Sequence, residues 1–140
     1  KDITNYPGAG AAGGMGGGLL AFFNAELKPG TELLLKAIDF SEKIKGADLI
    51  ITGEGKADRQ TAMGKVPYGI LKEAQKEHIP VIVLAGSIEN LPELNKAGFK
   101  GIFSIAPGPI TLEKAMEPEF AKENITRLVS QLYSVITSFG

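Results

Sequence analysis

The chain has 140 residues, which is the size of one ordinary domain and too short for two full α/β domains. With 44% apolar and 22% charged residues and a formal net charge of −1, it is typical of a soluble globular protein and has no basic excess for binding nucleic acid. Cysteine is absent, which excludes disulfides and thiolate chemistry and, with no signal peptide, predicts a cytoplasmic setting. The most apolar run, residues 19–23, is far shorter than the roughly 20 residues that cross a bilayer, so no membrane segment is predicted.

Glycine dominates the N-terminal segment. Seven of the 18 glycines lie between Gly8 and Gly18, separated by alanine and methionine rather than by the serine and charged residues of a flexible linker. We predict a loop over residues 7–10, a helix of small residues that ends near residue 24 or 25, and a second helix over residues 31–38. Bare glycine faces would let another backbone or a ligand approach closely, and the free amides of the first helix could meet an anion.

Three short apolar runs predict the strands of a sheet. They are residues 48–52, stopped by Gly53, residues 81–85, stopped by Gly86, and residues 101–105. Their apolarity is continuous rather than alternating, which indicates strands that are covered on both faces.

Helices separate these strands and follow the last one. Apolar residues recur at helical spacing over residues 66–78 and 91–97, and Pro118 opens a closing helix whose apolar stripe reaches Ile136. Strands that alternate with helices predict parallel pairing with right-handed crossovers. The predicted fold class is therefore α/β, a Rossmann-like three-layer α/β/α arrangement with a mainly parallel sheet, in which the closing helix covers one sheet face.

We predict one α/β domain over residues 1–140. Residues 1–45 would form a glycine-rich helical lead-in, and residues 46–140 a core of the βαβ type. Three strands are fewer than the about five or six that such sheets usually contain, so we expect the sheet to be incomplete in this chain.

A long polar loop after the first predicted strand carries the chemistry. Between Gly53 and Lys65 the sequence GEGKADRQTAMGK combines glycines with carboxylates, cations and amide side chains. Loops between strands and helices usually have about 2 to 6 residues, and ligands of open α/β sheets bind at the carboxyl ends of strands. Phosphoryl transfer needs this mixture: amides and cations for phosphate oxygens, and a carboxylate for Mg²⁺ or for a hydroxyl proton. The sequence favours a phosphate-handling loop over a solvated surface loop.

Two familiar nucleotide-binding motifs do not fit. GAGAAG, with Gly8, Gly10 and Gly13, has the spacing GxGxxG but follows a polar segment rather than a strand, so a dehydrogenase is only an alternative. A Walker A loop would need glycine in place of Arg59 and serine or threonine in place of Val66. With one histidine and no cysteine, a transition-metal site is not expected, whereas Mg²⁺ held by carboxylate and phosphate oxygens stays open.

Three blocks of the sequence resemble the bacterial glycerate kinase family. They are PGAGAAGGMGGGLLAF at residues 7–22, ADLIITGEGKADRQTAMGKVPYGI at residues 47–70 and IPVIVLAG at residues 79–86, and they occur in the family's order. The combination GEGxxDxQTxxGK is the specific part of the resemblance. The resemblance implies ATP-dependent phosphorylation of D-glycerate with Mg²⁺, in a cleft between a Rossmann-like domain and a second α/β domain, with the 2-hydroxyl favoured by analogy.

The resemblance also implies that part of this cleft is missing. Family members are well over twice as long and begin with a strand followed by a DSFKG-type motif and a DGGEGT-type motif, neither of which occurs here. We therefore expect this chain to be the C-terminal portion of a two-domain kinase and to be inactive alone.

On this basis we assign roles within the loop. Asp58 is the candidate Mg²⁺ ligand or general base, and Lys65 or Arg59 would neutralise charge on the transferred phosphate or on the substrate carboxylate. Gln60 and Thr61 would orient the reacting groups, and the amides of residues 53–55 would cradle an anion. The further candidates for binding substrate or phosphate are Gly53, Glu54, Gly55, Gly8, Gly10 and Ser87.

The expected partners are D-glycerate and ATP, and neither nucleic acid nor a membrane. A homodimer is a further expectation, because an uncovered sheet edge favours pairing with another chain. The alternative function is a non-catalytic α/β module that binds a sugar acid or phosphate in half a cleft.

Overall fold

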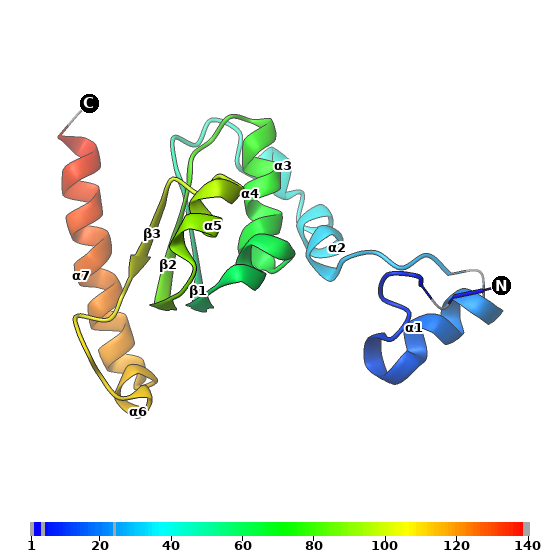
Figure 1. The fold of residues 1–140 in the computed structure, drawn as a ribbon. Helices are drawn as coiled ribbons and strands as arrows, with labels where there is room; N and C mark the ends of the chain where they lie inside the picture. The colour runs from blue at the N-terminus through cyan, green and yellow to red at the C-terminus, as the bar shows by residue number, and fades with distance from the viewer. Residues whose placement is uncertain (1, 4, 24, 139–140) are drawn as a thin grey trace.

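The computed structural model describes residues 2–3, 5–23 and 25–138. Within these ranges, helices form the N-terminal part, strands alternate with helices in the middle, and helices close the chain, as Figure 1 shows. The elements are, in chain order, α1 (Ala11–Phe22), α2 (Gly30–Ala37), α3 (Phe40–Lys43), β1 (Ile50–Ala57), the 3₁₀ helix η1 (Arg59–Met63), α4 (Val66–Lys76), β2 (Val81–Ile88), α5 (Leu91–Ala97), β3 (Gly101–Ser104), α6 (Leu112–Ala115) and α7 (Pro118–Thr137).

The three strands form one parallel sheet in the order β1-β2-β3. In its register Thr52 lies opposite Val83, and Ile82 lies opposite Gly101. Helices α4 and α5 make the crossovers between successive strands (Figure 1). The α/β class and the parallel pairing of the strands are therefore confirmed.

The core lies between the sheet and the two crossover helices. Alternate residues of β2, such as Val81 and Val83, belong to the cluster that packs under α4 and α5 and have no exposed surface. Ile82 and Leu84, which point to the opposite face, are only 7% and 8% exposed, so the central strand is covered on both sides as its continuous apolarity predicts. The buried cluster consists of Ile44, Ala57, Leu71, Ala74, Ile79, Val81, Val83, Ala85, Leu94 and Phe99.

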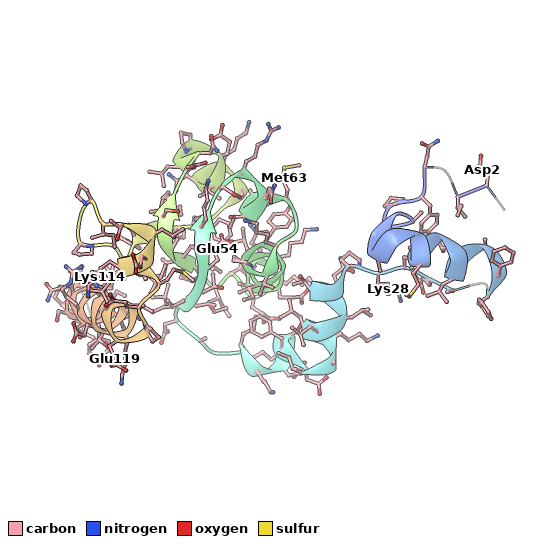
Figure 2. The ribbon with its side chains drawn as sticks, turned by 90° about the horizontal axis from the view of Figure 1, so that it is seen from below. Asp2, Lys28, Glu54, Met63, Lys114 and Glu119 are labelled. Carbon is pink, nitrogen blue, oxygen red and sulfur yellow. The ribbon has the colours of Figure 1, made fainter. Side chains whose placement is uncertain are left out.

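Helix α7 lies on the side of the sheet opposite α4 and α5, next to β3 (Figures 1 and 2). It begins at Pro118 as predicted, but its apolar stripe is not buried: Ile125 is 42% exposed and Ile136 46%. Asn124 is the one buried residue among the described residues of this helix. Part of the apolar surface of α7 is thus left exposed, although the central strand on this side of the sheet is covered. No helix in the described ranges is long and apolar enough to cross a membrane.

The strands β1 and β2 continue beyond the glycines that were expected to stop them. Strand β1 runs through Gly53 and Gly55 to Ala57, and β2 runs through Gly86 to Ile88, although Gly55 and Gly86 are not themselves paired in the register. The glycines permit this because the two backbones approach closely: a Cβ atom on Gly86 would lie 2.7 Å from the carbonyl oxygen of Gly55. The prediction of strand ends at these glycines was wrong, and the polar loop is correspondingly shorter.

The N-terminal segment stands away from the sheet, at the end of an extended link to α2 (Figure 1). Helix α1 ends at Phe22 rather than near residue 24 or 25, and Asn24 itself lies outside the described residues. Its first turn is left-handed, with φ of 52° at Ala12, so the regular helix begins only after residue 14.

The glycine face of α1 does admit another backbone, but that backbone is its own preceding loop. A Cβ atom on Gly16 would lie 2.6 Å from the carbonyl oxygen of Gly8, and the amide of Gly17 donates to the carbonyl oxygen of Ala9 over 2.8 Å. This close packing explains Gly16 and Gly17, whereas a Cβ atom on Gly10 would meet no atom of the described residues within 4 Å.

Candidate active site

The connection from β1 to α4 is a short turn held by a reciprocal cap. Asp58 accepts hydrogen bonds from the backbone amides of Gln60 (2.9 Å) and Thr61 (3.3 Å), and its own amide donates to Thr61 Oγ1 over 2.9 Å. The side chain of Thr61 is fully buried. The backbone amides at the start of η1 thus have hydrogen-bond acceptors, and these bonds fix the Asp58 carboxylate at the carboxyl end of β1.

Lys65 closes the turn and folds back over it. It is the residue before the first turn of α4, and its ammonium lies 3.1 Å from Asp58 Oδ1 and 3.6 Å from Glu54 Oε2. The carbonyl oxygen of Lys56 lies 3.5 Å from the same nitrogen. One ammonium is thus shared by a carboxylate from the turn and a carboxylate from the strand, and we call Glu54, Asp58 and Lys65 the charged triad.

The triad becomes more buried toward the strand. The side chain of Lys65 is 35% exposed, that of Asp58 21% and that of Glu54 12%. The second carboxylate oxygen of Glu54, Oε1, is buried and has no hydrogen-bond partner among the described residues. Figure 2 shows Glu54 on β1, an edge strand of the sheet, rather than on a loop.

The environment of Asp58 holds its carboxylate ionised. The hydrogen bond from Lys65 has the largest effect and lowers the pKa of Asp58 below its ordinary value of 3.8. Partial burial acts in the opposite direction, while the Gln60 amide, the Lys65 charge and the Thr61 amide also lower the pKa. A carboxylate whose pKa is lowered is a weaker proton acceptor than an ordinary aspartate. Of the two roles expected for Asp58, its surroundings favour charge pairing or cation binding over general-base catalysis.

The lowered pKa predicts how Asp58 affects stability at acidic pH. The ionised carboxylate stabilises the fold fully above the ordinary value of 3.8, and this contribution is lost as pH falls through the lower folded-state pKa. We expect the difference in unfolding free energy between wild type and Asp58→Asn to shrink as pH falls from about 5 to about 2. Urea unfolding across this range measures it, and a difference independent of pH would contradict the assignment.

The other expected site residues of the turn and strands divide into two groups. Arg59 and Gln60 have exposed side chains on η1, at the same end of the sheet as the triad. Gly53 and Gly55 lie inside β1 and Ser87 inside β2, opposite Lys56, so their amides belong to extended strands. The amides of residues 53–55 thus belong to a strand rather than to a glycine loop, and their role as an anion cradle stays a prediction.

Gly8 and Gly10 are not brought to this site. They precede α1, and Figure 2 shows Asp2 and Lys28 of the N-terminal segment well apart from Glu54. The structure unites Glu54, Asp58 and Lys65, with Arg59 and Gln60 beside them, but leaves the N-terminal glycines at a distance.

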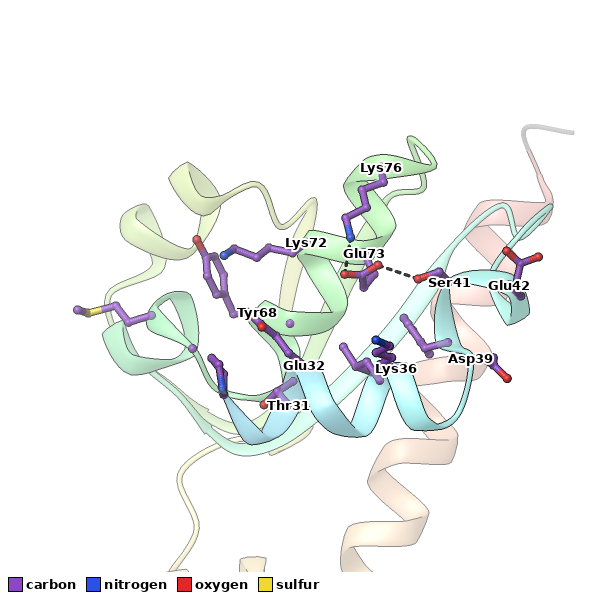
Figure 3. A pocket seen from close by; sticks show the side chains of 16 residues that line it. Thr31, Glu32, Lys36, Asp39, Ser41, Glu42, Tyr68, Lys72, Glu73 and Lys76 are labelled. Atoms are coloured by element: carbon purple, nitrogen blue, oxygen red, sulfur yellow. Dashed lines mark hydrogen bonds and ion pairs between the residues drawn. The ribbon is translucent and has the colours of Figure 1, made fainter. Parts of the chain in front are cut away.

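A groove of about 800 Å³ that the sequence did not predict lies next to the turn, between α2, α3 and α4 (Figure 3). Met63 and Tyr68 line its end nearest the turn. Farther along, Glu73 accepts from Ser41 over 2.7 Å and from Lys76 over 2.6 Å, and these contacts lower the pKa of Glu73, with Lys76 having the larger effect. The spacing of Glu73 and Lys76 is visible in the sequence, but the groove needs three helices to be assembled.

These features define a class of protein: a parallel α/β fold with a charged site at the carboxyl end of its strands, where such folds bind ligands. The chain matches the model of the family described as the glycerate kinase family over residues 1–137. It therefore belongs to the glycerate kinase family, which confirms the resemblance seen in the sequence.

Individual relatives agree with this assignment. The chain is 46% identical over 118 residues to a glycerate kinase of Halalkalibacterium halodurans, covering 84% of this chain and 31% of that protein. It is 44% identical over 135 residues to a glycerate kinase of Bacillus cereus, which covers 96% of this chain and 35% of that protein. It is 42% identical over 127 residues to a glycerate 2-kinase of Escherichia coli, which covers 90% of this chain and 33% of that protein.

A solved structure supports the fold. The crystal structure of a glycerate kinase 2 candidate from Salmonella typhimurium LT2 matches with a TM-score of 0.63 and 37% identity, covering 93% of this chain and 34% of that one. The chain thus spans about a third of the length of the relatives it matches.

Proposed function

We propose that this chain is the C-terminal portion of a two-domain kinase that transfers the γ-phosphoryl group of ATP to D-glycerate, with the 2-hydroxyl as the favoured acceptor. Membership of the glycerate kinase family supports the reaction, and the relative named glycerate 2-kinase supports the acceptor. The observation that carries the proposal is the charged triad, in which Asp58 and Glu54 share the ammonium of Lys65 at the carboxyl end of β1.

Exposed apolar side chains support the view that further protein covers this chain. Phe22 is 84% exposed, Phe23 76% and Leu112 78%. Phe22 and Phe23 are adjacent at the end of α1, and large apolar side chains exposed together are more typical of a surface that another protein covers. We propose that the remaining part of the kinase covers it and completes the cleft, and that residues 1–140 alone do not turn over substrate.

The residues at the turn suit the binding of anionic groups. In the proposed mechanism the Arg59 guanidinium, exposed beside the triad, binds a phosphate or the glycerate carboxylate. Lys65 stabilises charge that develops on the transferred group, and the Gln60 side chain orients the acceptor. The burial of Thr61 limits it to holding the turn, so its role is to keep Asp58 in place.

Asp58 fits the Mg²⁺ that the proposed reaction requires. No group of three or more Asp, Glu or His side chains suited to a metal occurs among the described residues. Mg²⁺ commonly binds one or two carboxylates together with nucleotide phosphates, so a single ionised carboxylate such as Asp58 matches this pattern. When bound, the ion would neutralise charge on the phosphates of ATP.

The reaction is tested with the full-length protein that carries this chain. Incubation with ATP, Mg²⁺ and D-glycerate, followed by phosphorus NMR, is expected to show ADP and 2-phosphoglycerate, and residues 1–140 alone are expected to show neither. Formation of 3-phosphoglycerate would reassign the acceptor hydroxyl. Binding of glycerate without any turnover would instead support the non-catalytic module.

The cellular location and the oligomeric state of the protein stay predictions. A cytoplasmic location and a homodimer agree with the proposed metabolic reaction and with the uncovered edge of β1. Size-exclusion chromatography with light scattering tests the dimer.

A further inference from the structure

Glu54 differs from the other charged residues at this end of the sheet in being almost enclosed. Its side chain is 12% exposed, and Oε1 has no hydrogen-bond partner in the part of the chain that the structure describes. A buried carboxylate is unfavourable unless it is paired. The one ion pair that Glu54 forms among the described residues is with the ammonium of Lys65, at 3.6 Å from Oε2.

A nearby ion pair shows what an ordinary surface contact looks like here. Lys56 and Glu89 join the ends of β1 and β2 over 2.8 Å, with both side chains half exposed, at 50% and 57%. Such a pair forms in water and contributes little. The contact between Glu54 and Lys65 is longer but lies in a more buried setting, where charges are less screened.

The two carboxylates of the triad approach Lys65 from different elements. Asp58 belongs to the turn and Glu54 to the strand, so together they restrict a long and flexible side chain from two directions. Without Glu54, the ammonium would keep the hydrogen bond to Asp58 at 3.1 Å and the long one to the carbonyl oxygen of Lys56 at 3.5 Å, but no second carboxylate would restrict it. Glu54 lies beneath it, within the sheet, and its buried position does not suit direct contact with substrate.

We propose that Glu54 is a positioning residue that holds the Lys65 ammonium in place for phosphoryl transfer. This inference rests on the proposed function, and it changes the expected role of Glu54 from binding substrate to orienting another residue. Because a misplaced catalytic group lowers the rate sharply, loss of the Glu54 charge reduces turnover without contact between Glu54 and the reacting atoms.

The test compares Glu54→Gln with Glu89→Gln in the full-length protein. Glu54→Gln keeps the shape of the side chain and removes its charge, and we expect kcat to fall by about 10-fold to 100-fold. Glu89→Gln breaks the exposed pair and is expected to leave kcat within about twofold of wild type. Glu54→Asp keeps the charge on a shorter side chain and should recover part of the lost rate, which also covers the case in which Glu54→Gln folds poorly.

A double-mutant cycle with Lys65→Met shows whether Glu54 acts through Lys65. If it does, Glu54→Gln causes no further loss of kcat in the Lys65→Met protein. An equal loss in both backgrounds, or a Glu54→Gln enzyme as fast as wild type, would overturn the inference. The same cycle can be measured by urea unfolding, which does not depend on activity. If the wild-type protein does not phosphorylate glycerate, the proposed function is wrong. The coupling free energy between Glu54 and Lys65 in the unfolding cycle still shows whether the two residues interact.

Discussion

The substitution Asp58→Asn is expected to lower kcat of the full-length kinase by on the order of 100-fold or more while leaving its fold intact. Asparagine keeps an oxygen in the position of Oδ1, so it can still accept from the amides of Gln60 and Thr61. It loses the negative charge that pairs with Lys65 and that would bind Mg²⁺. Steady-state kinetics measures the loss, and circular dichroism with thermal unfolding verifies the fold.

Two further variants separate charge from capping. Asp58→Ala removes the capping oxygen as well as the charge, so it should lower both kcat and the midpoint of thermal unfolding. Asp48→Asn changes an exposed aspartate just before the other end of the same strand and should behave as wild type. Near-normal turnover by Asp58→Asn would remove Asp58 from the mechanism, whatever its effect on stability.

The fold was predictable wherever local pattern and tertiary environment agree. The central strand β2 reads as a continuous apolar run because both of its faces are covered, and α7 starts at the proline that suits a first helical turn. The ends of β1 and β2 were not predictable in this way. Glycine normally weakens a strand, and only the close approach of Gly55 and Gly86, which lie 31 residues apart in the sequence, explains why both strands continue.

The site was predictable only in part, for a similar reason. Asp58 and Lys65 lie in one turn, so their proximity follows from the sequence. The position of Glu54 does not, because its enclosure depends on Lys65 folding back from the start of α4. The glycine motif and the family resemblance also predicted that Gly8 and Gly10 bind phosphate; in the structure the loop around Gly8 packs against α1, away from the triad, and their phosphate role stays a prediction.

Charge distribution links the triad to the proposed chemistry. Two carboxylates share one ammonium, so the triad carries a formal charge of −1 when all three groups are ionised. Such a site can accept one further cation without leaving a buried positive charge unpaired. A divalent ion that arrives with nucleotide phosphates would meet this surplus, which is a physical reason to expect Mg²⁺ and ATP to bind together.

The second large effect is expected from Gly86→Ala, which tests the close approach of the two strands beneath the site. Its Cβ would lie 2.7 Å from the carbonyl oxygen of Gly55, a backbone atom that cannot turn away. The strands must separate locally, so we expect the unfolding free energy to fall by about 1–3 kcal/mol, and by more for Gly86→Val. Because Glu54 precedes Gly55 in the same strand, kcat should fall as well.

The matched control is Gly55→Ala, on the partner strand. A Cβ there meets no atom of the described residues within 4 Å, so the same chemical change should leave the unfolding free energy nearly unchanged. Urea unfolding of the two variants in the full-length protein makes the comparison. Equal stability of the two would mean that the ladder at Gly86 has room for a side chain, and the glycine would then need an explanation in ligand binding rather than in strand packing.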